Sequence, residues 1–181
     1  MAAGGIPVEA EVPPGLNVAG ALALLSVWLP LLLLGALPST ACLLLGLSFY
    51  TASSIAAAVS IYELAGLLGE LGLLEGSGAA RFAAKAAILT PVTLAFTIYE
   101  ILYVAMGRLR EKVNGLQGCL DIDLVEDFKK LREPQPLDLM MVFITLGLHT
   151  ALYAAKAQRV FRYMVYVARE AAKAEKCCRS M

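Results

Sequence analysis

The amino-acid sequence predicts an all-helical integral membrane protein, a polytopic bundle of about four transmembrane helices with long helical extensions outside the bilayer. Of the 181 residues, 59% are hydrophobic, and the mean hydropathy is +0.72, whereas soluble domains are roughly 45–50% apolar. No Asp, Glu, Lys, Arg or His occurs between Glu11 and Glu63. Because one span needs about 20 residues, this charge-free stretch has room for two spans and a tight turn.

The first two predicted helices follow an irregular tail over 1–15, where prolines would block a helix. A first spanning helix is expected over 16–37. Pro30 should kink it, because the proline ring clashes with the preceding turn. A second helix is expected over 40–74, and its glutamates would project beyond the hydrocarbon because about 20 residues are enough to span it.

A third helix, expected over 79–113, completes a three-helix transmembrane region over 16–113. The apolar part of this helix contains Pro91 and one acid, Glu100, and it is bracketed by basic residues at both ends. Residues 114–136 are more polar and predict an amphipathic loop and short helix at the membrane surface.

A fourth transmembrane helix with a basic amphipathic extension is expected over 137–176, followed by a tail over 177–181. Residues 139–155 contain no acid, Lys or Arg, although 17 residues is the low end for a span. If this stretch does not cross the bilayer, three spans remain. Four are preferred, because an interfacial helix would show a strong polar face.

The distribution of Lys and Arg predicts cytoplasmic termini for a multi-pass protein with four spans. Nine basic residues then lie on the side of the termini and six on the other, and an excess of Lys and Arg marks the cytoplasmic side. With three spans the split is 13 against 2.

Three polar residues are candidates for an intramembrane ion path. Glu100 lies within an apolar segment, and intramembrane acids often mark ion or proton pathways. His149 is the only histidine and could form a relay with Glu100, while Lys156 opens a basic series on the last helix. The simpler interpretations are that the Glu100 carboxylate reaches the headgroups and that His149 forms an interhelical hydrogen bond. Lys156 would then belong to an ordinary cytoplasmic flank.

Four other charged residues predict an ion-paired extension outside the bilayer. Glu63 and Glu70 are seven residues apart and therefore share a helix face. Arg159 and Arg162 would lie on the same side of the membrane. We therefore expect these four side chains to form an ion-pair network between helices.

No metal or cofactor site is expected. The acidic cluster that begins at Asp121 lacks the central glycine of a calcium loop and has Arg132 at its twelfth position, so helix capping explains it better. The four cysteines form no CxxC pair and are interpreted as structural thiols. Cys177 and Cys178, beside basic residues, could alternatively carry a lipid.

The favoured function is that of a non-enzymatic accessory, assembly or scaffold subunit acting through helix association. Ala52, Ala56 and Ser60 recur every four residues, and small residues let helices approach closely in lipid. The expected partners are the lipid bilayer and other membrane subunits or further copies. The formal net charge of zero argues against nucleic acid.

Two alternatives stay open, a small ion or proton channel or transporter that uses an intramembrane Glu and, less favoured, a membrane-embedded enzyme. The sequence has no HExxH, GxSxG or P-loop motif, and one histidine leaves little for acid–base chemistry. No motif is specific enough to name a family.

Overall fold

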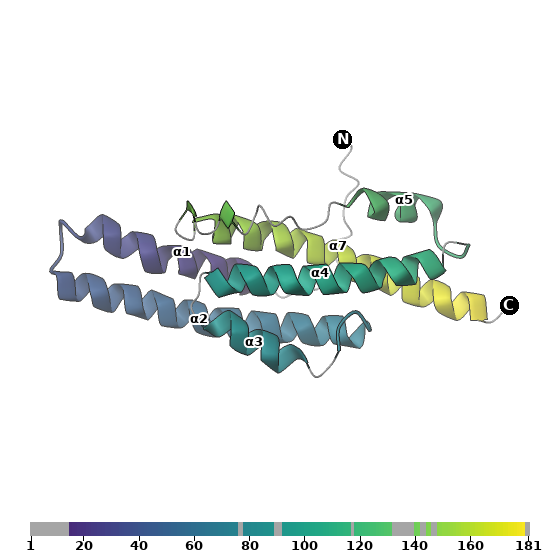
Figure 1. The fold of residues 1–181 in the computed structure, drawn as a ribbon, viewed down its shortest axis with the longest axis horizontal. Helices are drawn as coiled ribbons and strands as arrows, with labels where there is room; N and C mark the ends of the chain where they lie inside the picture. Colours follow the sequence, from purple (N-terminus) through teal and green to yellow (C-terminus); the bar gives the residue numbers. More distant parts are fainter. Residues whose placement is uncertain are drawn as a thin grey trace.

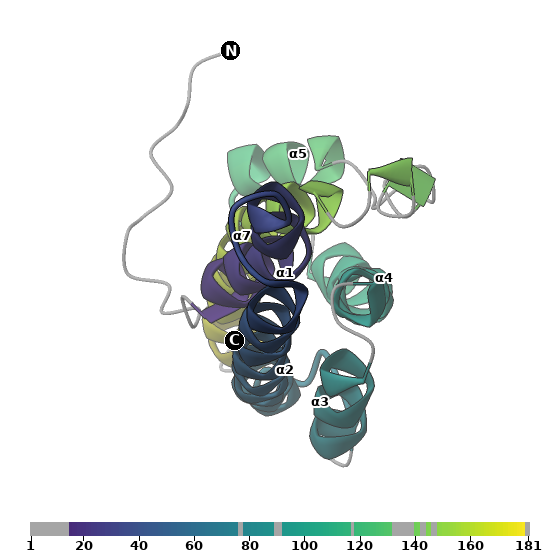
Figure 2. The same cartoon turned by 90° about the vertical axis from the view of Figure 1, so that its left-hand side faces the viewer.

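The computed structural model describes residues 15–75, 78–88, 92–116, 118–131, 140–141, 144–145 and 148–179, and these residues form a helical bundle with no strand among them. Its helices are α1 (Gly15–Leu33), α2 (Ser39–Glu70), α3 (Ala79–Ala87), α4 (Val92–Gly115), α5 (Ile122–Lys130) and α7 (Leu148–Arg179). Figure 1 shows α2, α4 and α7 running in one direction and α1 and α3 in the opposite direction. In the end-on view, α7, α1 and α2 form one layer and α4 and α3 a second (Figure 2).

The α1–α2 hairpin is held together by small residues. Ser53 Oγ of α2 donates to the carbonyl oxygen of Ala19 at 3.1 Å, and a side chain at Gly15 would collide with Ser60. The predicted small-residue face is correct at Ser60, which is buried, but Ala52 is exposed. The close approach of the two backbones favours packing and interhelical hydrogen bonds, which drive helix association in lipid.

The single helix expected over 79–113 is wrong, because the chain forms two helices that fold back on each other. Ile88 ends α3 in an extended conformation, with φ −86° and ψ 128°. Pro91 follows in the sequence, and a proline removes a helical hydrogen bond and disfavours helical geometry in the residue before it. The hydroxyl of Thr93 donates to the carbonyl of Ile88. As a result α4 runs parallel to α2 (Figure 1).

Helix α7 packs against α1 and α4. A Cβ at Gly20 of α1 would lie 3.1 Å from Cα of Ala151 and from Cβ of Ala154, so the glycine permits this contact. Further along, Phe161 and Met164 are fully buried in the core. The described helix begins at Leu148, and the predicted start at residue 137 lies outside the described residues.

The short helix α5 lies within the predicted amphipathic segment 114–136. Its N-cap is Asp121, whose carboxylate accepts the backbone N–H of Asp123 at 3.1 Å. Val125 and Phe128 bury one face of α5 against the bundle. The capping interpretation of the acidic cluster is therefore confirmed, but the capping-box pattern of Asp123 and Glu126 predicts an N-cap two residues later than the observed one, Asp121.

Three of the described helices, α1, α2 and α4, are long and apolar enough to cross a membrane. The expected fourth span is not among them, and its apolar beginning falls largely on residues outside the described ranges. The predicted tail 1–15 likewise lies outside them except for Gly15, which begins α1. The other predicted tail, 177–181, is wrong for its first three residues, which continue α7.

Candidate functional site

The charged residues of α3 and α4 meet in a crevice beside the end of α2. The amphipathic helix α3 positions its basic side chains here, because Ala79, Ala83 and Ala86 occupy its buried face. The crevice has a volume of about 200 Å³. It is lined by Leu74, Glu75, Gly78, Arg81, Phe82, Glu100, Val104 and Arg108.

Glu100 is ion-paired in this crevice. Lys85 Nζ donates to its two carboxylate oxygens at 2.9 and 2.7 Å. The same ammonium group lies 5.7 Å from the ring centroid of Phe82, within the range of a cation–π contact. The Lys85 and Glu100 side chains are 39% and 43% exposed, so the carboxylate lies at the surface of the bundle.

Two further contacts from α4 fix the end of α2. Arg108 donates to the Glu75 carboxylate at 3.0 Å. Lys112 Nζ donates to the carbonyl oxygen of Leu71 at 2.8 Å, where the negative end of the α2 dipole favours a cation. The cations in and around the crevice are therefore mostly balanced by carboxylates and a helix C-terminus, and this arrangement is suited to locking helices together.

Lys85 was not predicted as a partner of Glu100. In one continuous helix the two residues would be about 22 Å apart, at 1.5 Å per residue. The chain reversal between α3 and α4 brings them together. The only signal in the sequence is Pro91, which lies between them.

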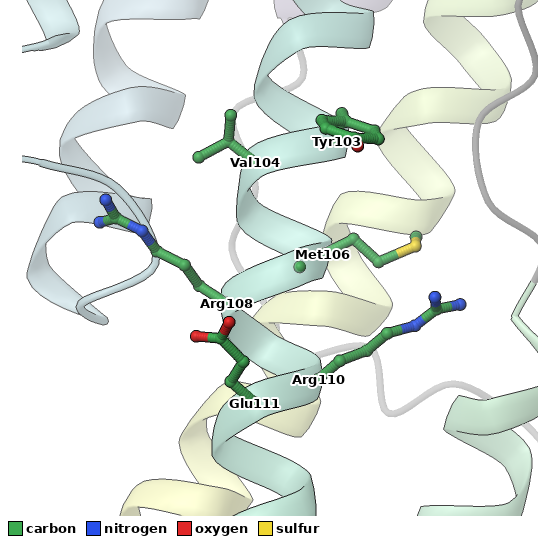
Figure 3. Close-up of a pocket in the computed structure, with 7 residues that line it drawn as sticks. Tyr103, Val104, Met106, Arg108, Arg110 and Glu111 are labelled. Atoms are coloured by element: carbon green, nitrogen blue, oxygen red, sulfur yellow. The ribbon is translucent and has the colours of Figure 1, made fainter.

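The outer face of α4 carries a second, shallow hollow of about 340 Å³. Figure 3 shows Tyr103, Met106 and Arg110 pointing to one side of the helix and Arg108 to the other. Gly107 lies among them, and a Cβ at this glycine would meet no atom within 4 Å. The lining contains no Ser, Thr, Cys or His.

The other two ion-path candidates do not join Glu100. The backbone N–H of His149 donates to Thr145 Oγ1 at 3.0 Å, and its ring Nε2 is buried. Lys156 is exposed on α7. The expected relay between His149 and Glu100 is not formed, since Lys85 binds the carboxylate.

The expected ion-pair network is also not formed. Glu63, Glu70, Arg159 and Arg162 are all exposed, and none of the ion pairs between described side chains includes them. The physical reason is the packing, because α2 contacts α1 and α3 while α7 contacts α1 and α4. The two helices therefore do not present these faces to each other.

An open apolar groove of about 610 Å³ runs along the hairpin near its turn. It is lined by Ser26, Val27, Pro30, Leu31, Leu34, Ser39, Cys42, Leu43, Gly46, Leu47 and Tyr50. At its floor the helices are close together, since a Cβ at Gly46 would lie 3.0 Å from Pro30 Cγ. No lining residue is charged, which makes the groove a surface for apolar groups.

A disulfide joins Cys119, in the loop after α4, to Cys178 in the last turn of α7, with Cα atoms 6.5 Å apart. The interpretation as structural thiols holds for buried Cys42, but not for this pair. The cross-link also rules out lipidation of Cys178 while it is intact. Within the described ranges, no group of His, Cys, Asp and Glu residues is placed to hold a metal ion.

No protein-family model, curated protein or solved structure matches this chain.

Proposed function

We propose that this protein is a non-enzymatic membrane subunit with an accessory, assembly or scaffold role, and that it acts by binding the transmembrane helix of another membrane protein along its α1–α2 hairpin. The apolar groove of the hairpin is the observation that supports this function best. Its position in the charge-free part of the chain suits an apolar helix as the occupant.

The geometry of the groove favours a helix partner. Gly46 and Ser26 leave its floor low, while the exposed leucines Leu31, Leu43 and Leu47 form its walls. In lipid, helices associate through close van der Waals packing at small residues, because apolar burial alone gives no advantage over acyl chains. A groove with small residues at its base and leucine side chains along its sides allows a second helix to pack closely in this way.

The surroundings of Glu100 speak against the alternative of an ion or proton path. A carboxylate that carries ions across a bundle should face its interior. Glu100 instead faces α3 and is neutralised by Lys85. We therefore propose that the pair has a structural role.

Photo-crosslinking in native membranes tests the proposed function. Leu47 lines the groove and is 54% exposed, while Val59 of the same helix lies outside the groove and is 52% exposed. A photoreactive amino acid at Leu47 should give a protein adduct whose peptide maps to a transmembrane segment, and the same group at Val59 should react mainly with lipid. Lipid adducts alone at both positions would overturn the proposal.

The ion-path alternative has its own test. Purified protein in liposomes should show no difference in proton or ion flux between the wild type and Glu100→Gln. A flux that depends on Glu100 would favour a channel or transporter and contradict the scaffold role.

A further inference from the structure

Exposed apolar side chains gather at one end of the bundle. Of the 20 large hydrophobic residues that are exposed in the described part of the chain, 13 lie in the α1–α2 hairpin. Soluble monomers rarely expose contiguous apolar patches larger than a few hundred Å². The hairpin turn end projects beyond the other helices (Figure 1), so this surface surrounds it. The hairpin end is therefore the part that needs an apolar surrounding.

The first charges of α2 and α4 lie at nearly the same level along the bundle axis. The bond from Lys112 to the Leu71 carbonyl sets the register of these parallel helices. Glu100 and Val59 each precede that contact by 12 residues, which is about 18 Å of helix. Glu63 follows Val59 by one helical turn. Both helices are thus free of charge from this level toward the hairpin turn.

The first charge of α7 falls close to the same level. Gly20 of α1 contacts Ala154, and its neighbour Ala19 accepts the hydroxyl of Ser53. Lys156 lies two residues beyond Ala154, near the level of residue 54 of α2, which is about 8 Å from the level of Val59 and about 14 Å from that of Glu63. An extended lysine side chain covers most of the shorter distance, to the level that Val59 shares with Glu100, and can point its ammonium group towards the headgroups.

The charge-free half of the molecule matches the thickness of a bilayer. From Ser39 to Tyr62, α2 covers about 36 Å, and α1 covers about 28 Å, at 1.5 Å per residue. The hydrocarbon core is about 30 Å thick. By contrast, α4 has only residues 92–99 before its first charge, and the described part of α7 has only residues 148–155. Each of these charge-free stretches covers about 12 Å.

We infer that the membrane boundary crosses the bundle at the level of Glu63, Glu100 and Lys156, so that, of the described helices, only α1 and α2 span the bilayer. The paired Lys85 and Glu100 then lie at the headgroups. The rest of α4, together with α5 and most of α7, stands outside the membrane on the side where α1 begins. Within the described ranges, only the turn over 34–38 reaches the other side. Outside the groove that the proposed partner helix would fill, the lipid bilayer is the occupant of the exposed hairpin surface.

The competing placement, with α4 as a full span, fits the described surface poorly. Val92 lies near the level of Thr51, so the hairpin turn would project about 18 Å beyond the hydrocarbon, counting 12 residues at 1.5 Å each. Exposed Leu32, Leu43 and Leu44 would then face water. Glu63 would lie in the hydrocarbon without an ion-pair partner among the described side chains.

Cysteine labelling separates the two placements in a variant whose native Cys42 and Cys177 are serine. Tyr103 of α4 and Ile55 of α2 are 63% and 61% exposed, so they form a matched pair. The proposal expects a charged maleimide to label Tyr103→Cys at least about tenfold faster than Ile55→Cys, because the hydrocarbon excludes charged reagents. Ser39→Cys should react only from the opposite side of the membrane. Equal protection of Tyr103→Cys and Ile55→Cys would overturn the proposal.

Trp28 allows a second test on the wild-type chain, because it is the only tryptophan. Its neighbours Ser26 and Pro30 contact Gly46, about 26 Å before Glu63 at 1.5 Å per residue, so the proposal places Trp28 inside the hydrocarbon, beyond its midplane. Lipids brominated on their acyl chains should quench its fluorescence strongly in proteoliposomes, and aqueous iodide should not. Quenching by iodide without quenching by bromolipid would favour α4 as a full span and overturn the proposal.

Discussion

Lys85 and Glu100 join α3 to α4 through two hydrogen bonds of 2.9 and 2.7 Å from one ammonium group. The pair closes a chain reversal whose helices contact each other directly. The Lys85 ammonium also lies 5.7 Å from the centroid of the Phe82 ring, which adds a cation–π contact within α3. The pair therefore stabilises the position of α3 rather than a buried reaction centre.

Neutralising either partner should loosen α3. Half-exposed ion pairs contribute about 0.5–1 kcal/mol, so Lys85→Ala and Glu100→Gln should each lower the free energy of unfolding by about that amount. The exchanged pair Lys85→Glu with Glu100→Lys should recover most of the loss in a double-mutant cycle measured in detergent micelles. Glu63→Gln is the control, since this exposed acid has no ion pair in the described structure. Equal losses in the exchanged pair and the single variants would contradict the interaction.

Two glycines of α2 should respond differently to substitution by alanine. A Cβ at Gly46 would lie 3.0 Å from Pro30 Cγ and 3.3 Å from the Ser26 carbonyl oxygen, while one at Gly66 would meet nothing within 4 Å. Gly66→Ala should stabilise the helix by up to about 1 kcal/mol. Gly46→Ala should lose that gain, because the hairpin helices must separate slightly. Denaturant unfolding in micelles compares them, and an equal gain in both variants would contradict close packing at Gly46.

The disulfide should fix the C-terminal end of α7. Cys119 and Cys178 are 59 residues apart, and closing a loop of this length contributes about 2–4 kcal/mol to stability. Cys178→Ser should therefore lower the midpoint of unfolding much more than Cys177→Ser, its neighbour outside the bond. Reductant should lower the midpoint of the wild type but not that of Cys178→Ser. A wild type insensitive to reductant would contradict the prediction.

The sequence is sufficient to predict the helical class and the first hairpin, because both follow from composition and from the long charge-free stretch. It is not sufficient to place Glu100. In the sequence, the apolar residues on both sides of Pro91 form one continuous stretch. The chain reversal at this point, which brings Lys85 to Glu100, could therefore not be derived. The predicted pairing of Glu63 with Arg159 failed for a related reason, since helix packing decides which faces meet.

The cross-link from Cys119 to Cys178 was equally inaccessible, because no local pattern connects residues so far apart. By contrast, local chemistry was readable in the acidic segment. Asp121 caps α5, and a short polar side chain is the usual N-cap of a helix. Local capping is therefore predictable here, while the contacts that build the charged crevice are tertiary.

Tyr163 should make stability fall at high pH. Burial raises the pKa of its hydroxyl above the ordinary 10.0, and the negative charge of Asp127 raises it further, as does Tyr166. The folded state thus holds this proton more tightly than the unfolded chain. Stability is unaffected by this group below about pH 10, and it declines as the pH rises from there through the raised folded pKa. An absorbance titration of tyrosinate, compared with Tyr163→Phe, should isolate the late-titrating hydroxyl.

The cause of this shift can be separated with two variants. Asp127→Asn should lower the pKa of Tyr163 only in part, because burial is the larger cause. Tyr163→Phe should remove the alkaline decline and should not destabilise the protein at neutral pH, since the buried hydroxyl has no hydrogen-bond partner in the described structure. A loss of more than about 1 kcal/mol at neutral pH in Tyr163→Phe would mean that the hydroxyl does form a stabilising hydrogen bond.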